Sequence, residues 1–173
     1  GSFIRKSVDG GQSFAPAYQG IVDSGFVYIA PLVIDPSDSE RLWTGGRALW
    51  LSANGAARWN QVSHALQQGA FAAIAVAPDD SNVVLAGTSA GSILRHANAL
   101  SGDDQWSNAT PRAGYVSGLA FDPVDHNIAY STYSTFGGVH VWRSADGGAT
   151  WTARATRSPA ARSPELPWAQ PWR

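Results

Sequence analysis

The sequence predicts an all-β fold, a partial β-propeller whose blades are sheets of four antiparallel strands. A short turn closed by an aromatic residue occurs four times, ending at Phe14, Trp59, Trp106 and Trp151. The steps between these aromatics are 45, 47 and 45 residues (59 − 14, 106 − 59 and 151 − 106). An internal repeat of about 40 to 50 residues that contains several short strands is typical of a propeller blade.

Each full repeat opens with an apolar run, at residues 27–34, 71–76 and 115–121. Such continuous apolar character predicts a strand buried on both faces. We expect this strand, called strand A, to be the innermost of its blade.

A polar turn with proline at its second position follows each run, at residues 35–38, 77–80 and 122–125. Proline presets φ at that position, and aspartate accepts hydrogen bonds from nearby backbone N–H groups. Strand B is then predicted at residues 41–45, 83–88 and 128–132. Strand C is predicted at residues 49–51, 93–95 and 139–143, and strand D begins at the closing aromatic.

These strands form one incomplete blade and three full ones, about three and a half blades in all. We expect strands C and D of the incomplete blade at residues 3–18, and full blades at residues 25–63, 70–110 and 115–156. A β-sandwich with chance similarity between its turns is the alternative fold, and the in-phase recurrence of both turn types disfavours it. The propeller segment thus covers residues 1–155. Residues 156–173 contain four prolines and no strand pattern, which predicts an extended or disordered tail.

The turn before each closing aromatic follows the pattern Ser-x-Asp-x-Gly-x-x-Trp/Phe. Its positions are Ser7, Asp9, Gly11 and Phe14 in the first copy, Ser52, Asn54 and Trp59 in the second, Asn98 and Trp106 in the longer third, and Ser144, Asp146, Gly148 and Trp151 in the fourth. Glycine supplies the positive φ of a tight hairpin, the polar side chains bond to the turn backbone, and the aromatic ring packs below it. One carboxylate per turn is too few for Ca²⁺, which takes about six to eight oxygens. The pattern therefore predicts a structural turn and no metal site.

This pattern is the Asp-box, or BNR repeat, and the chain resembles Asp-box propellers from residue 3 to about residue 154. That family includes sialidases, sortilin-like receptors, xyloglucan-cleaving glycosidases and photosystem II assembly factors. The resemblance implies a propeller fold, but the motif is shared across too many activities to imply one function. We expect such a chain to be a fragment of a larger propeller, with missing blades or self-association covering its exposed sheet edges.

Composition excludes several classes of function. The net charge is −1 and no cluster of Lys and Arg occurs outside the tail, so nothing indicates a nucleic-acid partner. No apolar run is long enough to span a membrane. Cysteine is absent, which excludes disulfides and thiolate metal sites, and the 4 histidines lack metal-ligand spacing. No cofactor is expected.

Strand alternation places the A–B and C–D turns at one end of the blades, and the B–C and D–A links at the other. We call these the turn end and the link end, and the resemblance implies that ligands bind at the link end. Among the acidic residues outside the tail, only Asp23 falls at the link end. Glycoside hydrolysis usually requires two facing carboxylates, so this distribution argues against catalysis by the chain.

The candidate ligand-binding residues are the polar and aromatic side chains of the link end. They are Arg47, His64, Arg112, Tyr115 and Tyr133. Aromatic rings with polar neighbours suit a sugar or an extended peptide, but each of these residues is also explained by local packing or by a solvated charge.

We therefore expect a non-catalytic propeller scaffold, or a module that binds a protein or a glycan, from a secreted or cell-envelope protein. The alternative is part of a glycoside hydrolase, sialidase-like or xyloglucanase-like, whose catalytic residues lie outside this chain.

Overall fold

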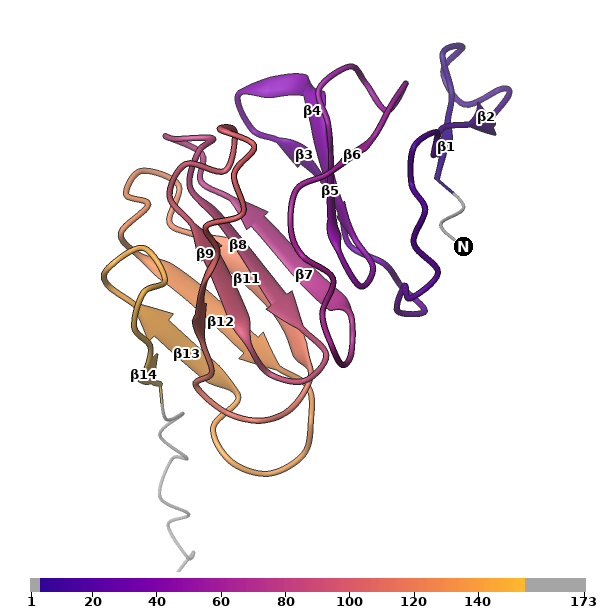
Figure 1. Ribbon diagram of the computed structural model, residues 1–173. Coiled ribbons are helices and arrows are strands. Elements are labelled where there is room, and N and C mark those ends of the chain that lie inside the picture. Colours follow the sequence, from indigo (N-terminus) through magenta and orange to yellow (C-terminus); the bar gives the residue numbers. More distant parts are fainter. Residues whose placement is uncertain (1–3, 155–173) are drawn as a thin grey trace, which may run out of the picture.

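The computed structural model describes residues 4–154, and every regular element in this range is a strand. The strands form one two-stranded hairpin and three four-stranded antiparallel sheets (Figure 1). The N-terminal hairpin is β1 (Arg5–Lys6) and β2 (Ala15–Pro16). Nothing in the described range is a helix that could cross a membrane. The predicted tail, residues 156–173, lies outside the described residues.

The three sheets follow one another along the chain, and we call them blades I, II and III. Blade I contains β3 (Leu32–Asp35), β4 (Asp38–Gly45), β5 (Leu49–Ser52) and β6 (Asn60–Gln61). Blade II contains β7 (Phe71–Val76), β8 (Val84–Thr88), β9 (Ile93–His96) and β10 (Ser107–Ala109). Blade III contains β11 (Val116–Phe121), β12 (Ala129–Tyr133), β13 (Val141–Ser144) and β14 (Thr152–Ala153).

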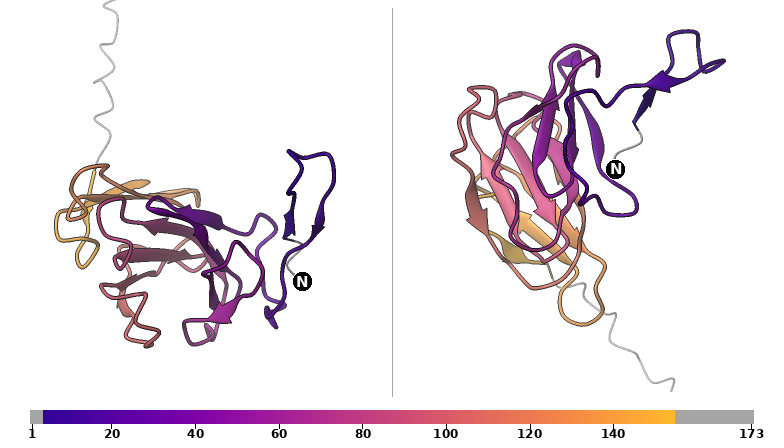
Figure 2. Two further views of the ribbon diagram at one scale, coloured as in Figure 1. Left: turned by 90° about the horizontal axis from the view of Figure 1, so that it is seen from above. Right: turned by 45° about the vertical axis from the view of Figure 1, so that its right-hand side comes forward.

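The blades are arranged as a fan, with the N-terminal hairpin at one end and blade III at the other (Figure 2). Within each blade the strands pair in chain order, so each sheet is a four-stranded meander. These features confirm the predicted fold class, an all-β partial propeller.

The first predicted strand A was too long. The structure begins β3 at Leu32, and the apolar run before it lies in the link, with Tyr28 fully exposed and Ile29 79% exposed. The reason is the length of the neighbouring strand, because β4 ends at Gly45 and β3 pairs with it only from Leu32, opposite Thr44. Residues before Leu32 therefore have no residue of β4 with which to form strand pairs.

Backbone hydrogen bonds confirm that the turns gather at one end of each blade. The C–D turn donates to the A–B turn of its own blade in blades II and III, Ala99 N to Asn82 O at 2.9 Å and Gly147 N to Asn127 O at 2.8 Å, and to the start of β4 in blade I, Gly55 N to Glu40 O at 2.8 Å. At the other end, Leu66 N in a D–A link donates to Arg47 O in a B–C link at 2.7 Å. Each blade is thus closed by a main-chain bond between its C–D turn and the A–B side of its sheet.

The Ser-x-Asp turns share one hydrogen-bond pattern. In blade III, the Ser144 hydroxyl accepts from Gly148 N at 2.8 Å and donates to Asp146 Oδ1 at 2.7 Å, which accepts from Thr150 N at 2.8 Å. The N-terminal hairpin and blade I repeat these bonds, with Asn54 Oδ1 accepting from Arg58 N at 2.9 Å in blade I. A side-chain amide therefore replaces the carboxylate with little change in the turn.

The third turn is built from different residues than the sequence suggested. His96 takes the place of serine, and its Nδ1 accepts from Asn98 N at 3.0 Å. Asp103, and not the side chain of Asn98, accepts the backbone bond at the far side of the turn, from Gln105 N at 3.0 Å. His96 Nε2 then lies 2.8 Å from Asp103 Oδ1. With Nδ1 accepting from Asn98 N, the other ring nitrogen, Nε2, donates to Asp103, so the imidazole bridges the two sides of the turn.

Two of the closing aromatics bond to the preceding sheet, whereas the Trp151 indole donates to Gly148 O of its own turn at 3.1 Å. Trp59 is 1% exposed, and its indole N–H donates to Ala17 O at 2.9 Å, just after β2. Trp106 makes the corresponding bond to Val62 O at 2.9 Å, just after β6. Phe14, however, is 54% exposed, because no described sheet packs on the other side of the hairpin. The aromatic is buried only where a preceding blade supplies the surface.

One turn position has left-handed backbone in three copies and carries glycine in only two of them. Gly11 and Gly148 have φ values of 90° and 96°, and Ala56 at the same position has φ 66°. A Cβ on Gly148 would lie 2.4 Å from Leu85 Cδ2 in blade II, whereas a Cβ on Gly11 would meet only Phe14 Cζ at 4.0 Å. Glycine is thus required by the backbone at Gly11, and by both the backbone and the adjacent blade at Gly148.

This difference can be measured by substitution. Gly11→Ala is expected to lower the free energy of unfolding by about 1 kcal/mol, the cost of a left-handed alanine. Gly148→Ala is expected to lower it by about 2 to 4 kcal/mol, because the overpacking against Leu85 is added. Urea denaturation measures both, and equal losses for the two variants would show that the contact with Leu85 does not constrain the turn.

Candidate functional site

The candidate site is a cavity of about 280 Å³ at the link end of blade I. It lies between the link that enters blade I and the turn that joins β4 to β5. The residues that line it are Val22, Asp23, Ser24, Arg47, Ala48, Trp50, Gln61 and Ala65. The wall combines an aromatic ring, a carboxylate and an amide, which is the composition expected of a site for a polar organic ligand.

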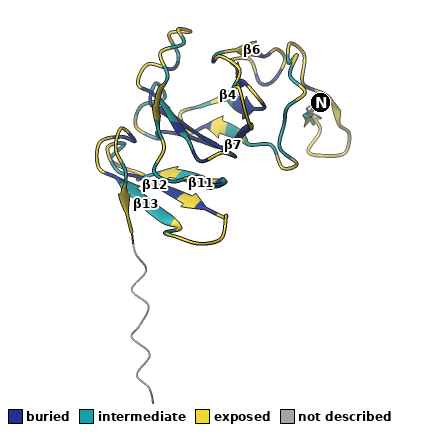
Figure 3. Cartoon of the chain, turned by 60° about the horizontal axis from the view of Figure 1, so that its bottom comes forward, coloured by how far each residue is buried: buried dark blue, intermediate teal, exposed yellow. Residues whose placement is uncertain are grey.

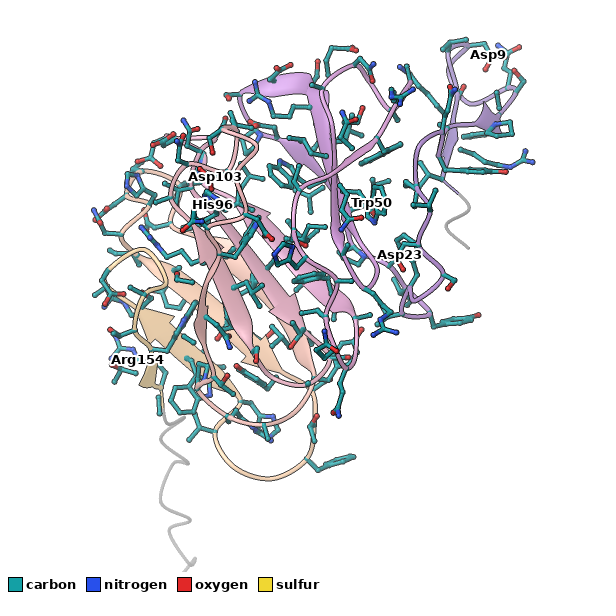
Figure 4. The ribbon with its side chains drawn as sticks, viewed as in Figure 1. Asp9, Asp23, Trp50, His96, Asp103 and Arg154 are labelled. Atoms are coloured by element: carbon teal, nitrogen blue, oxygen red, sulfur yellow. The ribbon has the colours of Figure 1, made fainter. Side chains whose placement is uncertain are left out.

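Asp23 is the only carboxylate in the lining, and main-chain donors fix its position. Its Oδ1 accepts from Gly25 N at 2.8 Å, and its Oδ2 accepts from Ala48 N at 2.8 Å and from the Trp50 indole N–H at 3.4 Å. Figure 4 shows Asp23 beside Trp50. A Cβ on Gly46 would lie 2.7 Å from Asp23 Oδ2, so glycine leaves room for the carboxylate at this turn.

These bonds also set the charge of Asp23. Partial burial acts to raise the pKa of the carboxyl group, but the N–H groups of Gly25 and Ala48 and the indole of Trp50 outweigh it, and the pKa lies below its ordinary value. Asp23 is therefore ionised at neutral pH and is a hydrogen-bond acceptor, not a proton donor.

Arg47 lines the same cavity, but its guanidinium is engaged by the protein. Nη2 donates to Leu66 O at 2.7 Å and to Gln67 O at 3.1 Å, and Nε donates to Leu66 O at 3.2 Å. The side chain thus ties the turn before β5 to the link that leads into blade II. Arg47 thus holds two loops together at the rim of the cavity, and we call an arginine that bonds to loop carbonyls in this way a clamp.

Arg112, in the link that enters blade III, makes a corresponding set of bonds and does not line the cavity. Its guanidinium donates to Ala113 O at 3.0 Å, to Val139 O at 3.1 Å and to Thr135 O at 3.2 Å. It also lies over the ring of Tyr133, with Cζ 5.5 Å from the ring centroid. Both candidate arginines therefore hold main-chain carbonyls of link-end loops.

Tyr133 is buried and is not part of an exposed surface. Only 2% of the residue is exposed, and its hydroxyl donates to Gly91 O of blade II at 2.9 Å. Burial raises the pKa of Tyr133 to about 12, although the nearby Arg112 charge acts to lower it. Tyr115 is half-buried at the start of blade III, where its backbone N–H donates to Thr135 Oγ1 at 2.8 Å.

His64 was expected at the link end, but it contacts a residue of a C–D turn. Its side chain is 94% exposed, and its Nδ1 lies 2.5 Å from Asp104 Oδ2. The sequence placed Asp104 in a C–D turn, at the opposite end from His64. The two meet because β6 is only two residues long, so the chain around His64 passes beside the long third turn, as the bond from Trp106 to Val62 also shows.

The structure thus brings one of the five candidate ligand residues, Arg47, to the cavity and leaves the other four outside it. Sequence reasoning placed Asp23 at the link end but did not identify Trp50 or Gln61 as cavity residues. Trp50 is 3% exposed within β5, and its strand pattern alone indicates a core residue. No local signal shows that its indole nitrogen points toward Asp23.

The carboxylates of the Ser-x-Asp turns have lowered pKa values. The hydroxyl and backbone N–H of Ser13, with the hydroxyl of Ser7, hold the pKa of Asp9 far below its ordinary value. Slight burial of Asp146 acts to raise its pKa, but the hydroxyl and backbone N–H of Thr150 and the Ser144 hydroxyl lower it to about 2. These oxygens are therefore occupied by the turn itself.

Comparison with known proteins gives structural matches only. No family model matches the sequence, and no curated protein matches it. An ancestral GH74 enzyme matches over 88% of this chain with a TM-score of 0.69 and 20% identity, and the match covers 21% of that enzyme. YCF48 bound to a D1 peptide matches over 78% of this chain with a TM-score of 0.53 and 14% identity, and 46% of YCF48 is covered.

A third match is the β-propeller domain of Cps50 (Swd1) from Myceliophteria thermophila. It covers 77% of this chain with a TM-score of 0.57 and 9% identity, and 39% of that domain is covered. At such identities the likeness shows the propeller fold alone. The chain spans less than half the length of each of these three structures.

The arginine clamps can be tested by hydrogen exchange. Arg112→Gln is expected to raise amide exchange in residues 134–140 about fivefold or more, because charge-assisted bonds to Thr135 and Val139 are lost. Arg47→Gln is the matched variant and is expected to raise exchange in residues 65–68 while leaving residues 134–140 unchanged. Unchanged exchange in both loops would show that neither arginine is a clamp.

The charge of Asp146 makes a prediction about acid stability. Its pKa is about 2 in the folded chain and 3.8 ordinarily, so its contribution to stability is present above about pH 4 and is lost as the pH falls toward 2. Asp146→Asn is therefore expected to have a lower Tm at pH 7 and a smaller fall in Tm between pH 7 and pH 2.5. Asn54→Asp is the reverse control and is expected to steepen that fall. Parallel pH profiles for wild type and Asp146→Asn would contradict this assignment.

Proposed function

We propose that the chain is a segment of an Asp-box propeller and acts as a non-catalytic binding module, with the cavity beside Asp23 as its ligand site. The ligand class is a glycan or an extended peptide. The single observation that carries this proposal is the lining of the cavity, where a fixed carboxylate, an aromatic ring and an amide surround about 280 Å³. The hydrogen-bond pattern of the Ser-x-Asp turns supports assignment to the Asp-box group.

The chemistry of the cavity favours recognition of hydroxyl or amide groups. Asp23 is ionised and each oxygen of a carboxylate accepts more than one bond, so it has acceptor capacity left for a ligand O–H or N–H. Gln61 is exposed at the rim and offers both a donor and an acceptor. Trp50 is almost fully buried, so its part in the wall is to donate its indole N–H to Asp23 and hold that carboxylate in place.

The same lining weighs against hydrolysis at this cavity. Cleavage of a glycosidic bond usually uses two carboxyl groups about 5 to 10 Å apart, one of which must donate a proton. Asp23 is the only carboxylate in the lining and its pKa is lowered, so a proton donor at neutral pH is not provided by the described wall.

The second candidate function is a non-catalytic part of a glycoside hydrolase. The observation that favours it is the match to an ancestral GH74 enzyme, which covers more of this chain than either YCF48 or the Cps50 domain does. In that case the catalytic carboxylates would lie on other blades, and the cavity beside Asp23 would hold part of a glycan. The match to YCF48 bound to a D1 peptide supports the peptide alternative.

The binding proposal predicts that filling the cavity removes binding. Ala65 is an exposed residue of the lining, so Ala65→Trp is expected to weaken binding at least about tenfold without unfolding the chain. Gln61→Ala removes one polar contact and is expected to weaken binding about three- to tenfold. Binding is measured on a glycan array that includes xyloglucan oligosaccharides, and on an array of short extended peptides.

The matched control is Ala145→Trp, which places the same ring on an exposed alanine of the blade III turn. This variant is expected to bind as the wild type does. No binding to either array, or equal loss in Ala65→Trp and Ala145→Trp, would reject the cavity as the ligand site. Cleavage of any glycan by the chain would reject the non-catalytic assignment.

A further inference from the structure

Asn54 differs chemically from the other asparagines of the chain, because it alone is followed by glycine. The backbone nitrogen that follows an asparagine can attack its side-chain amide, which makes asparagine a labile residue. Glycine has no side chain to hinder that attack. Asn54 also occupies the turn position that Asp9 and Asp146 hold in the first and fourth copies. Conversion of its amide to a carboxylate would therefore complete the Ser-x-Asp pattern in blade I.

The fold requires glycine at the position after Asn54. Gly55 has left-handed backbone, with φ 61°. A Cβ on Gly55 would lie 2.5 Å from Glu40 Oε2 and 2.7 Å from Lys6 Nζ. The residue that least hinders attack on the amide is thus fixed here by the backbone and by its neighbours.

The closed turn keeps the amide and the backbone nitrogen from reacting. Gly55 is buried, and its N–H donates to Glu40 O at 2.8 Å. Asn54 Oδ1 accepts from the Ser52 hydroxyl at 3.0 Å and from Arg58 N at 2.9 Å. The reaction therefore needs a local opening of the turn, and its rate scales with the fraction of molecules in which the turn is open.

One further bond closes this turn from outside blade I. Lys6 Nζ of β1 donates to Gly55 O at 2.9 Å. Asn54 itself is exposed, and Figure 3 shows the hairpin that carries Lys6 largely exposed as well. Local opening at Gly55 has to break the bonds to Glu40 and Lys6, both of which lie near the surface.

We propose that Asn54 is a site of self-modification, at which the chain converts this asparagine to aspartate without an enzyme. In the opened turn, the Gly55 nitrogen forms a bond to Asn54 Cγ and gives up its proton. The bond from Cγ to Nδ2 breaks, and the nitrogen leaves as ammonia with that proton. Water then opens the five-membered imide. Attack at Cγ gives aspartate, and attack at the main-chain carbonyl carbon gives isoaspartate, so the net change is one water consumed and one ammonia released.

Blade III shows why aspartate is the stable product in such a turn. Slight burial acts to raise the pKa of Asp146, but Thr150 and Ser144 donate to its carboxylate and lower the pKa to about 2. An ionised carboxylate resists attack by a backbone nitrogen. Gly147 N is also engaged, since it donates to Asn127 O at 2.8 Å, as Gly55 N donates to Glu40 O. An aspartate formed at position 54 would be protected in the same two ways.

Isoaspartate does not fit the closed turn. It adds one carbon to the backbone and removes one from the side chain. The bond to Arg58 N and the bond from Gly55 N to Glu40 O then no longer form together. Isoaspartate therefore remains in the open turn, where it can form the imide again until aspartate is produced and the turn closes.

The test follows the whole chain by peptide mapping during incubation at mildly alkaline pH, with mass spectrometry to detect the change from amide to acid. Conversion is expected at Asn54 and not at Asn98, which is followed by alanine. It is expected to be at least about tenfold slower than in a synthetic peptide of residues 50–60, because the closed turn protects Gly55 N. Aspartate is expected to be the main product in the chain and isoaspartate in the peptide, with Asn54→Asp as the reference for identifying the aspartate form.

A pair of variants tests the role of turn opening. Lys6→Ala removes the bond to Gly55 O and is expected to raise the conversion rate about threefold or more. Arg5→Ala is the matched control, because Arg5 donates to Phe14 O on the same hairpin and is expected to leave the rate unchanged. An intact Asn54 in the chain under conditions that convert the peptide would overturn the proposal. So would equal rates in chain and peptide, or isoaspartate as the main product in the chain. The cavity beside Asp23 takes no part in these measurements, so their outcome is independent of ligand binding.

Discussion

Burial of the aliphatic side chains on one face of each innermost strand is the interaction on which the whole fan depends. Ile74 and Val76 are covered because β3, β4 and β5 lie against them, and blade II covers blade III through the same positions. A single blade is a thin meander with two apolar faces, so it is stable only between neighbours. The stacking of the blades in chain order follows from this requirement.

The turns fix each blade once it is stacked. The side chains of each Ser-x-Asp turn accept hydrogen bonds from the N–H groups of the turn, and the turn also donates one main-chain bond toward the A–B side of its blade. The same arrangement is made by serine with aspartate, by serine with asparagine, and by His96 with Asp103. The links at the opposite end of the blades differ from one another in length and in sequence. The cavity beside Asp23 lies there, at the link of residues 17–31 that enters blade I.

Most strands and turns were predictable from the sequence because their signals are local; strand A of blade I and the residues of the third turn were not. Proline and aspartate mark the A–B turns, and the closing aromatics give the period. The site was less predictable, because Arg47 bonds to Leu66 O and Arg112 to Val139 O across links that sequence does not place in space. An arginine that clamps a loop and an arginine that binds a ligand look the same in a sequence. The meeting of His64 with Asp104 likewise depends on how short β6 is.

The indole bonds between successive blades have a consequence for how the chain loses its structure. Trp59 of blade I reaches back to Ala17 and Trp106 of blade II reaches back to Val62, whereas the Trp151 indole of blade III donates to Gly148 O of its own turn. Each blade thus contacts only its neighbours along the chain. In such a linear array, each blade is stabilised only by the blades next to it, so unfolding is cooperative only between adjacent blades. Disruption on heating is expected to begin at the exposed N-terminal hairpin and to pass along the fan, so that blade II, held on both sides, is the last to melt.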